Sequence, residues 1–475
     1  MRVMLQSLTD PNGEQASSAT RPAGADDHPG LPMPRRAWAI VAICFGTSLL
    51  VIDGAIASVA LPTIARDLGV SNAVVTNVVT VYQLVLVMFL LPFSSLGDRV
   101  GHRRLYQAGQ ALFMLSCALC MFADNLALLL VLRTVQAIGA AMALSVSAAM
   151  LRQIYPAKRL GSGLGLNSVI VASSAALAPT LGGWIVGNLA WQWVFVVAAP
   201  LAAISLLLGR ALPEPEPQDR PAEWLSGALS ALTMLLLIGG LQLATHGDMM
   251  AGSVIIVLGV ALLAALVRRE RQRETPVLPV DLLAMPVLGL TALASMASFI
   301  AASALMLSLP FRLEVGMGYP PQTVGLLLLP FPLTMLVISP IAGWASDRIA
   351  PTKLGVTGMG IAIVGLLLLA AMPDAPGEWG IAWRLALTAL GFALFFAPNS
   401  RLLIGRAPRA RAAAAGGLLS TSRLLGQALA AVVVGILLAG GLGMGPEPFY
   451  LACALAIVAA GCSVVRYQFR DAVAD

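Results

Sequence analysis

The segment LPFSSLGDRVGHRRL, residues 91–105, joins one long apolar run to the next, and SPIAGWASDRIAPTKL does the same at residues 339–354. Each segment has a proline before the turn, an Asp-Arg pair at the turn and a basic residue after it. The matching residues are Pro92, Asp98, Arg99 and Arg103 in the first segment and Pro340, Asp347, Arg348 and Lys353 in the second. A weaker similarity joins LRTVQAIGAAM, residues 132–142, to WRLALTALGFAL, residues 383–394. The sequence therefore predicts a duplicated structural unit.

The composition around these segments is that of a membrane protein. Hydrophobic residues make up 58% of the 475 positions and charged residues 11%, whereas soluble domains are about one quarter charged. Apolar runs of about 20 residues, long enough to cross the ~30 Å hydrocarbon core as helices, recur along the chain. A membrane β-barrel would show short alternating strands instead. We therefore expect an all-α membrane protein.

The apolar runs predict fourteen membrane spans. Two six-helix units with two extra central helices between them account for this number. The expected spans are residues 36–58, 74–96, 104–123, 126–151, 161–186, 191–211, 222–244, 250–267, 284–310, 321–344, 353–372, 379–402, 412–440 and 447–466.

Charge gives an independent test of this count, because Lys and Arg collect in cytoplasmic loops. With a cytoplasmic N-terminus, the inner segments hold 22 of the 29 basic residues, or 24 with those of the N-terminal tail, and the outer loops hold Arg66 and Arg312. Both ends of the chain are thus predicted to be cytoplasmic. If the runs at 222–244 and 250–267 did not cross, the chain would have twelve spans and every later loop would still lie on the same side of the membrane. The length and apolarity of these two runs favour fourteen spans.

The expected organisation follows from the spans. Residues 1–34 are polar, contain Pro and Gly, and are predicted to be a disordered cytoplasmic tail without a cleavable signal peptide. The N-terminal six-helix half is expected at 35–211 and the C-terminal half at 284–467. Residues 212–283 would hold the two extra spans and their linkers. Residues 468–475 would form a second cytoplasmic tail.

Several function classes are excluded by what the sequence lacks. The net charge of +6 is spread over short clusters between spans, so no basic face exists to hold nucleic acid. There is no nucleotide-binding glycine loop, HExxH metal motif or nucleophile-base motif, and no room for a soluble catalytic domain. An enzyme, an ATP-driven pump and a metal or other cofactor are therefore not expected. The CxxC of Cys117 and Cys120 lies inside a span, where it favours packing over redox chemistry.

Charged residues inside spans are costly and point to function. Asp53, in SLLVIDGAIASVALP, is either a residue that reaches the outer interface or a buried carboxylate that exchanges a proton or meets a cationic substrate. Arg133 in the fourth span stays charged at any working pH, with Gln136 one helical turn below it. It is either an interhelical structural tie or a group that biases protonation of a nearby carboxylate. Arg384 and Arg423 are further candidate intramembrane cations; the alternatives are that Arg384 reaches outward to the interface and that Arg423 lies near a helix break.

Two segments are predicted to control conformation. Gly97, Asp98, Arg99, Gly101 and Arg103, with their repeat at Asp347 and Arg348, would form a gate in which Asp98 pairs with arginines across the inner face; an ordinary basic loop is the alternative. In the fifth span, Pro179 removes a backbone hydrogen bond beside Gly182 and Gly183, which allow close helix contact. These three residues would form a hinge, with simple packing as the alternative.

Taken in order, these segments resemble motifs of the major facilitator superfamily, in its fourteen-span drug:proton antiporter branch, over about residues 36–467. LGDRVGHRR resembles the loop motif after span two and LRTVQAIGAA the span-four motif with its coupling arginine. ALAPTLGGW resembles the span-five motif of antiporters, and VIDGAIASVALP the first-span signature. Departures include Ser94, Ala137 and Ser174, where the motifs usually have glycine.

The resemblance implies a bacterial inner-membrane exporter of amphipathic or cationic small molecules such as drugs, biocides and dyes. Protons would be the exchanged ion, with Asp53, Arg133 and Gln136 at the coupling site, and the chain would act as a monomer. A dedicated exporter of one endogenous metabolite is the main alternative. Import is a further one, although the span-five motif favours export. Repeats of this kind are typical of secondary transporters, whose substrate site lies between the halves near the midplane.

Overall fold

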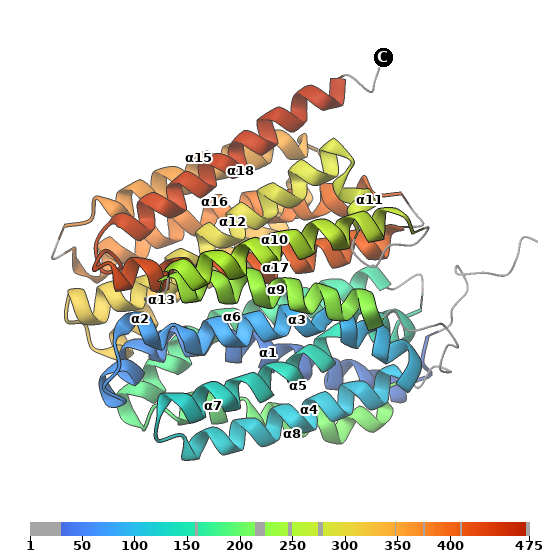
Figure 1. Ribbon diagram of the computed structural model, residues 1–475, viewed down its shortest axis with the longest axis horizontal. Coiled ribbons are helices and arrows are strands. Elements are labelled where there is room, and N and C mark those ends of the chain that lie inside the picture. Colours follow the sequence, from blue (N-terminus) through green and yellow to red (C-terminus); the bar gives the residue numbers. More distant parts are fainter. Residues whose placement is uncertain are drawn as a thin grey trace, which may run out of the picture.

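The computed structural model describes residues 30–156, 160–213, 224–245, 249–273, 279–346, 348–373, 376–408 and 411–471. The predicted tail at 1–34 falls mostly outside these residues, as do Asp347 and the end of the tail at 468–475. The described chain is helical and contains no β-strand (Figure 1). Its α-helices are α1 (Arg35–Asp67), α2 (Asn72–Val75), α3 (Asn77–Val100), α4 (His102–Leu119), α5 (Leu126–Ile154), α6 (Leu160–Asn188), α7 (Trp193–Val196), α8 (Ala199–Leu208), α9 (Trp224–Thr245), α10 (Met249–Arg271), α11 (Val280–Leu283), α12 (Pro286–Phe311), α13 (Pro321–Leu328), α14 (Pro330–Ala345), α15 (Pro351–Ala370), α16 (Gly377–Gly405), α17 (Ala412–Ala439) and α18 (Glu447–Asp471). Short 3-10 turns lie at η1 (Cys120–Phe122) and η3 (Gly209–Ala211), and a π-helical turn at η4 (Arg312–Gly316).

The membrane explains why the chain is helical. An apolar segment in hydrocarbon must satisfy its backbone polar groups within itself, and a helix does so. Thirteen segments of the described residues are long and apolar enough to cross a membrane. The 29-residue helix α6, which contains no charged residue, is a further long helix beyond these thirteen. The fourteen predicted spans therefore each correspond to helix, with α7–α8 and α13–α14 as broken spans.

The helix ends follow local sequence rules. Asn125 caps α5, its side chain accepting a hydrogen bond of 2.9 Å from the backbone N–H of Leu128. Pro286, Pro321 and Pro351 occupy first-turn positions, where the missing N–H costs nothing. Gly101 separates α3 from α4 with a φ of +99°, a backbone conformation that favours glycine. The sharp turn at the centre of the repeated loop motif therefore requires this residue.

The helices form two bundles with a pair of helices beside them. Helices α1 to α8 group together in the lower part of Figure 1, and α12 to α18 in the upper part, with α9 and α10 crossing in front between them. The pair α9–α10 is attached to both bundles, because α9 packs against α3 and against α17. Leu84, Ile238, Ala428 and Val432 form the apolar core of this three-helix contact.

The duplication is visible in the packing of corresponding helices. Gly109 of α4 touches α5 so closely that an added Cβ would lie 2.6 Å from the Gly139 carbonyl oxygen. Gly358 of α15 touches α16 in the same way, with the Gly391 carbonyl oxygen 2.7 Å from such a Cβ. Gly109 follows Asp98 by eleven residues and Gly358 follows Asp347 by eleven. The third and fourth spans of each half, which are α4 and α5 in one and α15 and α16 in the other, thus meet at equivalent glycines.

The bundle has two distinct ends. One end, called the basic face below, holds the beginning of α1, the end of α3 and the ends of α10 and α16, on the right of Figure 1. It carries the basic clusters, including Arg35, Arg104, Arg271 and Arg406. The other end, the opposite face, holds the end of α1, α2 and the beginning of α13.

The glycine contacts give a first testable expectation. Replacing Gly358 by Ala forces α15 and α16 apart, because the methyl group would meet the backbone of Gly391. Overpacking of this kind costs about 1–3 kcal/mol. We expect Gly358→Ala to lower the apparent melting temperature of the detergent-solubilised protein.

Gly360, two residues further along α15, provides the matched control, because a methyl group added there would have no atom within 4 Å. Gly360→Ala should melt at the wild-type temperature or slightly above it. Equal melting temperatures for the two variants would show that the α15–α16 contact is looser than described.

Candidate functional site

A buried ion pair joins α1 to α5 inside the N-terminal bundle. Arg133 Nη1 donates to both carboxylate oxygens of Asp53, at 3.0 and 2.9 Å. Gln136 completes the group, its Nε2 donating to Asp53 Oδ1 at 2.9 Å and its Oε1 accepting from Arg133 Nη1 at 2.6 Å. Asp53 and Gln136 are fully buried and Arg133 is 1% exposed. The three predicted coupling residues therefore lie together, and Asp53 does not reach an interface.

Side chains from α3, α4 and α7 enclose this ion pair. The Tyr82 ring lies under the guanidinium, with 4.1 Å from Arg133 Cζ to the ring centroid, and the Phe195 ring lies at 5.1 Å. Gln136 Nε2 also donates to Cys117 Sγ at 3.0 Å. Sequence analysis missed Tyr82 and Phe195 as site residues. Their only sequence signal is an aromatic in an apolar run, which core packing produces as readily.

The arrangement has a specific chemical capacity. The guanidinium keeps its charge, so the net charge of the group changes only through Asp53. A proton on the carboxylate removes an acceptor of charge-assisted hydrogen bonds from Arg133, and such bonds are about twice as strong as neutral ones. Protonation of Asp53 would therefore loosen α1 from α5.

The loop motif between α3 and α4 forms a compact turn at the basic face. Gly97 is buried, and an added Cβ would lie 2.5 Å from Val146 Cγ1 of α5. Asp98 Oδ1 pairs with His102 Nε2 at 3.0 Å, across the turn at Gly101. The expected pairing of Asp98 with arginines across the face is not what the structure shows. The turn places His102 beside the end of α3, where it meets Asp98. Arg99 is exposed and Arg103 is half-buried.

The repeat of this motif is only partly described. Asp347 lies outside the described residues. Arg348 is exposed and stacks on its own segment, with its Cζ 3.8 Å from the Trp344 ring centroid. The structure thus describes the proposed gate in full in one half only, and the gate stays a prediction.

The predicted hinge residues lie at a contact between the two bundles. Helix α6 is continuous through Pro179. A Cβ on Gly182 would meet Ile56 Cγ1 of α1 at 2.9 Å, and one on Gly183 would meet the Pro321 carbonyl oxygen of α13 at 2.5 Å. The small residues of the span-five motif therefore let α6 pack against both α1 and α13.

A second polar link between the bundles lies near the opposite face. Glu314 of η4 is 8% exposed, and its Oε1 accepts from Thr63 Oγ1 of α1 at 3.0 Å and from Arg66 Nη2 at 3.3 Å. Arg312, two residues earlier, donates to the Leu369 carbonyl oxygen at 3.2 Å and lies over the Phe449 ring. These contacts involve the two basic residues that the charge analysis placed outside. Both are tied to the protein surface near this face.

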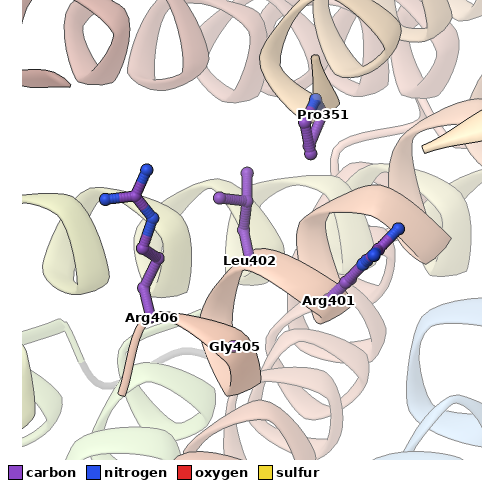
Figure 2. Close-up of a pocket in the computed structure, with 5 residues that line it drawn as sticks. All are labelled: Pro351, Arg401, Leu402, Gly405 and Arg406. Carbon is purple, nitrogen blue, oxygen red and sulfur yellow. The ribbon is translucent and has the colours of Figure 1, made fainter. Parts of the chain in front are cut away.

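A cavity of about 150 Å³ opens at the basic face of the C-terminal bundle (Figure 2). Pro351 at the start of α15 lies across it from Leu402 and Arg406 near the end of α16, and Gly405 and Arg401 complete the lining. Arg401 Nη1 donates to Ser346 Oγ at 3.0 Å. The cavity lies in the other bundle from Asp53, so it does not form part of the ion-pair site.

The ion pair predicts an unusual mutational pattern. Asp53→Asn leaves a buried guanidinium without its counter-ion, and removing one partner of a buried pair costs about 3–5 kcal/mol. The double variant Asp53→Asn with Arg133→Gln has no buried charge to compensate. We expect the single variant to melt well below wild type and the double variant to recover much of the loss. A single variant as stable as wild type would contradict the dry environment described for Arg133.

The link at Glu314 predicts a shift in conformation. Glu314→Gln removes a charge-assisted hydrogen bond between the bundles, and such a bond contributes about 1.5–3 kcal/mol. Each ~1.4 kcal/mol changes the ratio of open to closed conformations about tenfold. Spin labels at exposed Leu189 and Leu442 would report the distance across the opposite face. Half-buried Cys44 is replaced first, since the other four cysteines are buried. The variant should populate longer distances about tenfold more than wild type.

Glu378, exposed at the start of α16 near the same face, is the control, and Glu378→Gln should leave the distances unchanged. Identical distance distributions for Glu314→Gln and wild type would show that Glu314 does not hold the bundles together.

Comparison with known proteins places this architecture in a family. A family model described as Major Facilitator Superfamily matches residues 43–431 and, in an overlapping match, 291–473. The uncharacterized transporter YebQ of Escherichia coli (strain K12) is 39% identical over 439 residues, which are 91% of this chain and 96% of YebQ.

Two relatives at lower identity have named activities. The riboflavin transporter RibZ of Clostridioides difficile is 29% identical over 83% of this chain and 87% of its own length. The multidrug efflux pump LfrA of Mycolicibacterium smegmatis is 29% identical over 85% of this chain and 81% of its own length.

A solved structure agrees in fold. The crystal structure of a peptide transporter in complex with sulfate superposes with a TM-score of 0.69 at 16% identity, covering 94% of this chain and 97% of that one. The similarity extends over both bundles. The chain is an integral membrane protein that belongs to the major facilitator superfamily of transporters.

Proposed function

We propose that the chain exports amphipathic or cationic small molecules in exchange for protons, as a member of the fourteen-span drug:proton antiporter branch. The observation that carries this proposal is the fully buried Asp53 carboxylate, held by Arg133 and Gln136 between α1 and α5. An intramembrane acid of this kind is expensive to maintain and is typical of proton relays. Similarity to the multidrug efflux pump LfrA supports the substrate class.

The proposed coupling follows from the charges. A proton that enters binds a carboxylate oxygen of Asp53 and cancels its charge, which weakens the hydrogen bonds from Arg133. Loss of that proton restores the ion pair and the tight contact between α1 and α5. Because α1 also carries Thr63, which bonds to Glu314 of the C-terminal bundle, a shift of α1 reaches the contact between the bundles.

The remaining predicted roles belong to this cycle. Residues 35–211 and 284–467 would move against each other, with 212–283 beside them, and the loop at Asp98 would stabilise one state. Pro179, Gly182 and Gly183 of α6 would form the hinge. We place the basic face in the cytoplasm of a bacterial cell, with both termini inside, because basic residues collect there. The chain would work as a monomer.

A second candidate is export of one endogenous metabolite with the same fold. The similarity to the riboflavin transporter RibZ, at an identity equal to that of LfrA, supports it. A panel of cationic dyes and antiseptics separates the two functions, since a dedicated exporter would give resistance to none of them.

The coupling is tested with protein reconstituted in liposomes. Asp53→Asn cannot bind and release the proton, so we expect it to lose substrate accumulation driven by a proton gradient. Exchange of labelled for unlabelled substrate needs no net proton movement and should persist, which also verifies folding. Full gradient-driven accumulation by Asp53→Asn would refute the assignment.

Loss of exchange as well would indicate misfolding. In that case, substrate-induced proton release from purified wild-type protein decides the question. Release with cationic dyes supports antiport, and no release with any compound argues for transport without protons.

A further inference from the structure

Arg423 is an intramembrane cation that the ion-pair site does not use. It lies on α17 eleven residues from the start of the helix, about 16 Å along its axis at 1.5 Å per residue. This depth places it well inside the apolar segment Ala414–Ala439. Its side chain is partly exposed in the structure. A guanidinium at this depth costs several kcal/mol unless it is paired or hydrated.

The part of the chain that the structure describes gives Arg423 no counter-ion. Within the described residues it makes no hydrogen bond, ion pair or ring contact, in contrast to Arg133, which binds Asp53. Helices α9, α12 and α17 contain no Asp or Glu. On α3, which also packs on α17, the one acid is Asp98 at the basic end, and it pairs with His102. The acids of these four helices thus do not pair with Arg423, and its position is open to an anion from outside the protein.

The position of Arg423 on its helix indicates where that anion would lie. Ala430 and Val434 follow it by seven and eleven residues, which puts all three on one face of α17. Both are fully buried in one apolar cluster with Ile52 and Ile56 of α1. Near the opposite face of the protein, this side of α17 is thus packed between the bundles. At Arg423, nearer the basic face, the same side of the helix is accessible.

Aromatic rings lie next to this position. Gly426, one turn after Arg423, packs against α12 so closely that an added Cβ would lie 2.9 Å from Phe299 Cβ. The Phe299 ring stacks on Phe396 of α16, with centroids 4.4 Å apart and planes 12° apart, and Phe396 stacks in turn on Phe392. Phe299 and Phe396 are partly exposed. A flat aromatic surface therefore lies on the α12 side of α17, one helical turn from Arg423.

We propose that Arg423 and the Phe299–Phe396 pair form a subsite for an aromatic molecule that carries a negatively charged group such as a carboxylate. The guanidinium would donate to the acid, and the phenyl rings would pack against the aromatic body. The inference rests on the proposed transport function and singles out, among its amphipathic substrates, aromatic acids and zwitterions as those that bind this subsite. Such molecules are amphipathic, and a zwitterion keeps the cationic group expected of drug-like substrates.

The test uses two dyes that differ only at the acid. Rhodamine 110 has a free carboxylate, and rhodamine 123 is its methyl ester. Equilibrium binding to purified protein is followed by fluorescence anisotropy, without a proton gradient. Wild type should bind rhodamine 110 about tenfold or more tightly than its ester, the size expected for a hydrogen bond to a charged group.

Variants assign the preference to its residues. Arg423→Gln should bind both dyes equally, with the loss confined to rhodamine 110, and Arg423→Lys should keep most of the preference. Phe396→Leu should weaken both dyes alike. Arg384→Gln is the matched control, because Arg384 already donates to the Gly380 carbonyl oxygen of its own helix and lies over the Trp383 ring, and this variant should keep the wild-type preference.

The outcomes separate this inference from the proposed function. An equal loss of both dyes in Arg423→Gln, an unchanged preference in that variant, or no preference in wild type would each overturn the subsite. A preference that depends on Arg423, in a protein without proton-coupled transport, would uphold the subsite while the proposed antiport fails.

Discussion

The buried pair of Asp53 and Arg133 constrains the N-terminal bundle more than any other contact. Two full charges inside a low-dielectric core are tolerated only with good geometry and with the remaining polar positions filled. Here both carboxylate oxygens accept from Arg133, and Gln136 donates a further hydrogen bond to Oδ1. This geometry requires α1, α3 and α5 to lie at fixed distances, since Tyr82 of α3 also covers the guanidinium. The pair therefore determines where α1 lies in the bundle.

The same helix makes the contacts that join the two bundles. Ile56, one turn after Asp53, meets Gly182 of α6, and Thr63 lies about two turns further along and bonds to Glu314. Asp53 and Thr63, the partner of Glu314, are thus ten residues apart on the single helix α1. This continuity is a physical route for the proposed coupling, with α1 as the two-state element that both sites bias.

The sequence predicted what depends on composition and periodicity. The spans, the repeat around Asp98 and the burial of Asp53 with Arg133 follow from hydropathy and from the cost of isolated charge in a membrane. It did not predict which side chains meet across helices. Asp98 pairs with His102 because of the turn at Gly101, and Glu314 meets Arg66 from 248 residues away. Such partners depend on helix rotation and register, which apolar stretches rich in Leu, Ala and Val do not specify.

The intramembrane arginines differ in the groups that the protein provides to stabilise their charge. Arg133 has a carboxylate, and Arg384 uses the Gly380 carbonyl of its own helix. Arg466, expected in a cytoplasmic segment, is instead 3% exposed in α18 and donates to Thr291 Oγ1 at 2.9 Å and to Asn399 Oδ1 at 3.0 Å.

Each of these three arginines donates through Nη1 to a group of the protein, whereas the Nε atoms of Arg384 and Arg466 are buried and have no partner within the described residues. Arg423 is the exception among the described intramembrane arginines, because it has no such partner there, and Gly426, one turn after it, packs on Phe299 of the stacked phenylalanines. A cation that the fold leaves unpaired there is best explained by a molecule that enters with the missing charge. The N-terminal bundle would then supply the proton-sensitive group and the C-terminal bundle the contact to the cargo.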